Sequence, residues 1–160
     1  MTTRNRVPAL GAEGWFTPDA DSPALIGQRC TTCGTYAFPR ADLGCPSPTC
    51  AGTEMVETEL SRRGKVWSYT DARYQPPPPY VVPGDEHVPF AIAAVHLAEE
   101  GLVVMGQVVA GVGVGELTVG TEMAVVVDVL FSDDETDHLV WKWKPVTETS
   151  ATVATQGATR

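Results

Sequence analysis

The sequence has no long apolar run and few basic residues. Its longest apolar stretch, residues 102–110, has the length of one strand, whereas a membrane-spanning helix needs about 20 residues. Eleven lysines and arginines against 20 acidic residues give a net charge of -9 and a pI near 4.6. Because sequence-independent binding to nucleic acid relies on basic surface, this composition disfavours nucleic-acid partners. Residues 1–10 lack an apolar signal-peptide core, so we expect a soluble, cytoplasmic protein.

The sequence also contains few residues suited to catalysis. None of its three histidines, His87, His96 and His138, has a neighbouring nucleophile, so each is predicted to be structural or at the surface. No lysine follows the glycines of residues 111–115, which argues against a phosphate-binding loop. We therefore predict that this chain has no catalytic residue of its own.

All four cysteines of the chain lie within residues 30–50. Cys30 and Cys33 form a Cys-x2-Cys pair, and Cys45 and Cys50 form a Cys-x4-Cys pair. Disulfides would need an oxidising compartment, and a redox Cys-x-x-Cys motif would not need the second pair. Two such pairs can instead surround one tetrahedral metal ion, which predicts one structural zinc per chain. A closed four-thiolate site leaves no position for substrate and no spare thiol for a nucleophile.

Beyond residue 54 the pattern predicts five strands. β-branched and aromatic residues place them at residues 65–73, 90–97, 102–109, 123–131 and 138–144. A tight turn predicts a hairpin between the second and third strands, and four consecutive prolines begin a long loop after the first. Closing five strands into a barrel removes exposed sheet edges. We therefore predict a mainly β chain whose C-terminal part is a five-stranded OB-fold barrel.

Four regions are predicted along the chain. Residues 1–27 are expected to form a flexible arm followed by a short helical or turn segment that carries aromatic residues. Residues 28–53 are the rubredoxin-like zinc ribbon, and residues 54–146 are the OB-fold barrel. Residues 147–160 form a Thr- and Ala-rich tail, which we expect to be mobile unless a partner orders it.

Several short motifs follow one another in an order that is typical of one family. They are Gly-Trp-Phe at 14–16, Leu-Ile-Gly-Gln-Arg-Cys-Thr-Thr-Cys-Gly at 25–34, Phe-Pro-Arg at 38–40, Arg-Gly-Lys-Val-Trp-Ser-Tyr-Thr at 63–70, Pro-Phe at 89–90 and Val-Gly-Thr-Glu-Met at 119–123. Across residues 15–145 the chain resembles the zinc-ribbon and OB-fold proteins associated with acyl-CoA thiolases and lipid-transfer-type thiolase homologues. Its Cys-x4-Cys spacing departs from the tighter second knuckle that is commoner there, although all four ligands are present.

This resemblance implies a function within a complex. Such proteins bind a thiolase-like subunit and help to form its acyl-CoA site, while the partner supplies the catalytic groups. The implied assembly is a heterotetramer with two copies of each subunit, acting as an acyl-CoA aldolase (a carbon–carbon lyase) or thiolase. The implied reaction is retro-aldol cleavage of a steroid side-chain CoA thioester. The alternative from another class is single-stranded nucleic-acid binding, a common role of OB barrels that the acidic composition disfavours.

Two groups of residues are candidates for contacting acyl-CoA or the partner. The aromatic group flanks the ribbon and the four prolines, where a stiff loop loses little entropy on docking. The basic group would suit CoA phosphates if the first and last barrel strands approached each other. Simpler explanations stay open, since the aromatics could only cap the barrel and the basic residues could only aid solubility. The candidates are Trp15, Phe16, Tyr74, Tyr80 and Phe90 in the first group, and Arg62 and Arg63, with Lys65, Arg73, Lys142 and Lys144, in the second.

Overall fold

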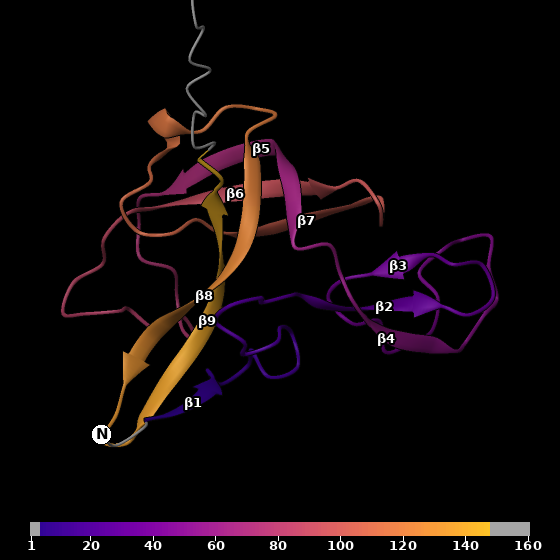
Figure 1. Cartoon of the computed structure of the whole chain (residues 1–160), viewed down its shortest axis with the longest axis horizontal. Helices are drawn as coiled ribbons and strands as arrows, with labels where there is room; N and C mark the ends of the chain where they lie inside the picture. The colour runs from indigo at the N-terminus through magenta and orange to yellow at the C-terminus, as the bar shows by residue number, and fades with distance from the viewer. Residues whose placement is uncertain (1–3, 148–160) are drawn as a thin grey trace, which may run out of the picture.

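The computed structural model describes residues 4–147 and is built almost entirely of β-strands (Figure 1). The elements are β1 (Asn5–Pro8), β2 (Ile26–Cys30), β3 (Tyr36–Ala37), β4 (Met55–Glu59), β5 (Arg63–Ala72), β6 (Phe90–Leu97), β7 (Leu102–Gln107), the 3-10 helix η1 (Val114–Glu116), β8 (Glu122–Ser132) and β9 (Thr136–Pro145). The mainly β composition predicted from the sequence is confirmed.

Strands β5 to β9 form the predicted barrel. The larger sheet has the order β1-β9-β8-β5-β6-β7, and β6 and β7 form the expected hairpin. A parallel bridge between Val108 and Trp143 then joins the end of β7 to β9, so the sheet curls back on itself (Figure 1). The five-stranded OB-fold prediction is therefore confirmed.

Alternating side chains fill the barrel interior. Every second residue of β6 from Ala91 to Leu97 is buried, while the intervening residues point outward. Trp143 is fully buried, and Trp141 packs against it edge-to-face with ring centroids 5.7 Å apart. Because burying one large apolar side chain contributes about 1.5–3 kcal/mol, this interior provides the main stabilisation of the barrel.

The ribbon is a separate three-stranded sheet with the order β3-β2-β4, which projects to the right in Figure 1. Leu60, directly after β4, is buried in the same hydrophobic cluster as Val66 of the barrel. Phe38 of the ribbon packs edge-to-face on Trp15 and on Trp141, at centroid distances of 5.7 and 6.2 Å. Buried aliphatic and aromatic contacts, in addition to the chain itself, therefore join ribbon and barrel.

The N-terminal arm is not free, in contrast to the prediction. Its residues form β1, which pairs in parallel with β9 at the lower left of Figure 1. Arg4 strengthens this pairing, since its guanidinium forms an ion pair with Asp137 at 2.7 Å. The Arg4 side chain also donates hydrogen bonds to backbone carbonyl oxygens of the turn between β8 and β9. The arm is therefore an edge strand fixed by contacts that are distant in sequence.

The segment at residues 14–27, expected to be a short helix or a turn, is a turn between two extended ends and contains no helix. Its two ends pair with each other through an antiparallel bridge between Phe16 and Leu25, and both side chains are buried. Two prolines interrupt this segment, and the carboxylate of Asp19 accepts hydrogen bonds from two following backbone N–H groups. These residues favour a turn over a helix because they satisfy the backbone locally.

None of the helices within residues 4–147 is long and apolar enough to cross a membrane. The predicted tail, residues 147–160, lies outside the described residues except for Thr147. The region boundaries stay predictions, and one detail bears on them: β4, assigned to the barrel region from the sequence, pairs with the ribbon strand β2.

Candidate metal centre and binding surfaces

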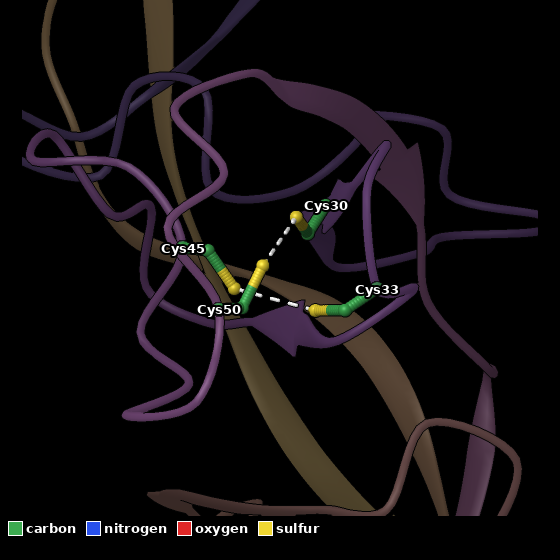
Figure 2. Close-up of side chains that lie close together, drawn as sticks. All are labelled: Cys30, Cys33, Cys45 and Cys50. Atoms are coloured by element: carbon green, nitrogen blue, oxygen red, sulfur yellow. Dashed lines mark hydrogen bonds between the residues drawn. The ribbon is translucent and has the colours of Figure 1, made fainter.

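Four cysteines from separate segments converge at one end of the ribbon (Figure 2). Cys30 ends β2 and Cys33 lies in the turn after it, whereas Cys45 and Cys50 lie between β3 and β4. Their sulfur atoms all lie within 4.8 Å of one another. The Sγ atoms of Cys30 and Cys50 are 3.9 Å apart, and those of Cys33 and Cys45 are 3.5 Å apart. All four are free thiols.

These spacings fit a zinc ion. Four Zn–S bonds of about 2.3 Å, arranged as a tetrahedron, place neighbouring sulfurs about 3.8 Å apart. A disulfide would require a separation of about 2.0 Å, so the cysteines are not paired as two disulfides. The cluster therefore supports the predicted structural zinc, and a four-thiolate site would leave no coordination position for water or substrate.

Hydrogen bonds from the chain lower the pKa of the Cys30 and Cys33 thiols, whereas neighbouring thiols and burial raise the pKa of Cys45, to about 12, and of Cys50. The Gly52 N–H donates a hydrogen bond to the Cys50 Sγ at 3.3 Å. Hydrogen bonds with the Thr35 hydroxyl, 3.1 Å away, and with the Thr35 backbone lower the pKa of the Cys33 thiol to about 6. A Cβ at Gly52 would lie only 3.0 Å from the Cys30 Sγ, so this turn needs a glycine. Such contacts suit metal ligands, which bind as thiolates.

The aromatic residues predicted to contact acyl-CoA or the partner lie in different environments. Phe16 is only 2% exposed and packs in the shared core, while its neighbour Trp15 remains partly exposed. In the proline-rich loop, Tyr80 stacks on Phe90 with ring centroids 5.8 Å apart. This contact anchors the loop on the start of β6, and it leaves Tyr74 at the surface.

The predicted basic group does not form one patch. The first and last barrel strands, β5 and β9, are separated by β8, so the condition for a joint patch is not met. Arg62 and Arg63 already pair with carboxylates, at 2.8 and 3.6 Å. Lys142 is buried in an ion pair of its own. A smaller set remains together, because Arg63, Lys65 and His96 line one hollow of about 230 Å³.

Two features were not predicted from the sequence. A largely apolar pocket of about 440 Å³ lies between the proline-rich loop and the glycine-rich connection after β7. The prolines and glycines indicated loops, but nothing in the sequence indicated that the loops meet. Trp67 on β5, with Val103 and Met105 on β7, forms exposed apolar surface. The apolar run at residues 102–105 was a signal, yet such a run does not show which side chains face outward.

Two family models match this chain in succession. One is described as ChsH2, rubredoxin-like zinc ribbon domain, and matches residues 19–56. The other is described as ChsH2, C-terminal OB-fold domain, and matches residues 57–128. Together they cover more than half of the chain, in the order that the fold shows.

Individual relatives give the same assignment. A DUF35 domain-containing scaffold protein from Methanocaldococcus jannaschii is 39% identical over 87 residues, which are 53% of this chain and 55% of the relative. The benzoylsuccinyl-CoA thiolase subunit BbsA from Thauera aromatica is 43% identical over 53 residues, 33% of this chain and 35% of the relative. The matched region thus spans about half or less of these curated relatives. A solved structure, the Ltp2-ChsH2(DUF35) aldolase, is similar with a TM-score of 0.55 and 27% identity, covering 76% of this chain and 84% of that chain.

Proposed function

We propose that this chain, which belongs to the family of ChsH2-type zinc-ribbon and OB-fold proteins, is the accessory subunit of a thiolase-like enzyme. The observation that carries this proposal is the similarity to the Ltp2-ChsH2(DUF35) aldolase over 84% of that chain. A further relative, BbsA, is a subunit of a benzoylsuccinyl-CoA thiolase. Both similarities support a chain that acts within a larger enzyme.

In the proposed complex the partner supplies the nucleophile and the acid–base groups. A zinc ion held by four thiolates has no free coordination position, so it stabilises the ribbon and does not activate water. The chain binds the partner and helps to form its acyl-CoA site. We assign the complex to retro-aldol cleavage of a steroid side-chain CoA thioester, in a cytoplasmic heterotetramer with two copies of each subunit.

The candidate contact residues have distinct parts in this proposal. Arg62 and Arg63, just before and at the start of β5, would meet the CoA phosphates together with Lys65. Their ion pairs lie at the exposed surface, where such pairs contribute little, so a phosphate can replace a carboxylate there. The exposed Tyr74 and the partly exposed Trp15 would contact the partner.

Single-stranded nucleic acid is the alternative ligand for an OB barrel, and it has less support. Binding a strand requires basic side chains free to follow the phosphates along a groove. Within residues 4–147, six of the ten lysines and arginines already pair with carboxylates, and the whole chain carries a net charge of -9. A measured oligonucleotide affinity in the nanomolar range at physiological salt would reverse this preference.

The proposal is tested by producing the chain together with a thiolase-like candidate partner from the same genome. We expect the two proteins to co-purify, with about one zinc per copy of this chain. The complex should cleave a steroid side-chain CoA thioester, and the partner alone should not. Separate elution of the two proteins, or full activity of the partner alone, would contradict the proposal. The mass of the complex in solution measures its stoichiometry.

A further inference from the structure

Three neighbouring barrel strands carry an outer surface that we call the apolar sheet face. Residues directly opposite each other in a sheet share a side, and the buried residues Val95 and Val104 show which side is the interior. The outward side chains are Lys65, Trp67, Ser68 and Thr70 on β5, Ile92, Ala94 and His96 on β6, and Val103, Met105 and Gln107 on β7. The three strands form the upper part of the molecule in Figure 1.

Large apolar side chains are exposed to solvent on this face. Trp67, which lies in a β-bulge, is 64% exposed, Met105 is 68% exposed and Val103 is 46% exposed. An antiparallel sheet normally carries polar residues on its solvent side. Apolar residues gathered on one face, unlike scattered ones, mark an interaction site.

The charge pattern of the apolar sheet face is equally uneven. None of its ten positions carries a carboxylate, although the chain has 20 acidic residues. Its charge is confined to one end, where Lys65 pairs in register with His96 on β6 and, on its other side, with Glu122 of β8. An uncharged centre with a polar edge is the arrangement of a protein–protein interface. The centre of this face has no charged side chain that could bind a phosphate group.

We propose that the apolar sheet face is the surface of this chain that the thiolase-like partner covers, an inference that rests on the proposed function. A second copy of this chain is a poor occupant, because it would bring two net charges of -9 together. A different polypeptide with an apolar centre and an acidic edge fits this surface. The face ends at Gln107, which also lines the 440 Å³ pocket, so the partner would border that pocket.

The test uses the full chain produced with the same thiolase-like candidate partner. Met105→Glu and Val103→Glu each place a charge at the centre of the apolar sheet face, and Trp67→Ala removes its largest side chain. Leu10→Glu is the matched control, since Leu10 is 97% exposed and follows β1, which is not one of the three strands of the apolar sheet face. Zinc content and melting temperature equal to those of the wild type show that each variant is folded.

We expect Met105→Glu and Val103→Glu each to weaken binding to the partner at least about tenfold, with a similar loss for Trp67→Ala, while Leu10→Glu binds as the wild type does. Hydroxyl-radical footprinting needs no substitution: Trp67 and Met105 of the wild type should be oxidised several-fold more slowly in the complex than in the free chain. Wild-type affinity in all three variants, or equal oxidation in both states, would overturn this inference and leave the proposed function standing.

Three other outcomes would each lead to a different conclusion. If the wild-type chain does not bind the partner at all, the proposed function fails and this inference with it. If the free wild-type chain is a dimer that Met105→Glu converts to a monomer, a second copy covers the face and the proposed occupant is wrong. Equal weakening by Leu10→Glu would show that added charge anywhere disturbs the complex, which would also overturn the inference.

Discussion

Replacing Gly106 by alanine tests the packing that joins the barrel to the ribbon. Gly106 pairs with the buried Ala93, and a Cβ at its position would lie 2.3 Å from Cη2 and 2.4 Å from Cζ3 of Trp141. Carbon atoms in contact are about 3.5–4.0 Å apart, so the Trp141 ring would have to move by about 1 Å or more. It has little freedom to do so, because it lies between Trp143 and Phe38.

The expected effect is large for the addition of one methyl group. Overpacking a well-filled interior destabilises a protein by about 1–3 kcal/mol, and the rigid tryptophan pair places Gly106→Ala near 3 kcal/mol. For a chain of this size, that loss lowers the melting temperature by about 6–12 °C. A glycine-to-alanine change in open space would instead stabilise the protein by about 0.4–1 kcal/mol, because alanine lowers the conformational entropy of the unfolded chain. The sign of the change in stability therefore distinguishes a crowded site from an open one.

Calorimetric melting of the zinc-loaded protein measures this effect, and two variants serve as controls. Gly115→Ala is the matched control, because no atom lies within 4 Å of a Cβ there, and it should melt at or slightly above the wild type. Trp141→Phe removes the ring atoms that clash, so Gly106→Ala should cost at least about 1 kcal/mol less in that background. A Gly106→Ala protein that melts like the wild type, or an absence of coupling to Trp141, would refute the packing argument.

Three further predictions concern the metal site and the N-terminal strand. Cys50→Ser should reduce the zinc content from about one ion per chain to near zero by elemental analysis, and retained zinc would contradict the four-thiolate site. Gly52→Ala should release zinc to a chelator faster than the wild type, because the new methyl group crowds a ligand sulfur; an unchanged rate would contradict this crowding. The pKa of Asp137 is lowered by hydrogen bonds from Ser132 and Arg4, so its contribution to stability is present above about pH 4 and is lost as the pH falls through the lower folded value. Asp137→Asn should therefore destabilise the protein at pH 7 and have little effect near pH 2 in urea unfolding; equal effects at both pH values would contradict the linkage.

Local patterns were sufficient where neighbouring residues decide the structure. The five barrel strands follow from β-branched and aromatic runs separated by prolines, glycines and acidic turns, and the metal site follows from two close cysteine pairs. Of the helix or turn expected at residues 14–27, the turn forms, because Asp19 and two prolines satisfy the backbone locally.

Long-range pairing could not be read from the sequence. The pairing of Asn5 with Thr136 in β1 and β9 depends on residues that are distant in the chain, as does the ion pair of Arg4 with Asp137. The same limit applies to the basic residues, whose proposed patch required β5 and β9 to be neighbours, whereas β8 lies between them. The apolar run that begins β7 shows the remaining limit, because both of its alternating sets are apolar and only the barrel determines that Val103 faces outward.

The joint between ribbon and barrel explains why a closed zinc site matters for a binding protein. A three-stranded ribbon is too small to be held by a core of its own, so it needs the metal at one end and the barrel at the other. Leu60 follows β4 directly into the shared core, and Phe38 of the ribbon packs on Trp141. Zinc fixes the strands from which these side chains extend, so ribbon and barrel are held in one arrangement before any partner binds. A partner that contacts both parts then loses less conformational entropy on binding, which is how a non-catalytic ion can contribute to the affinity of a complex.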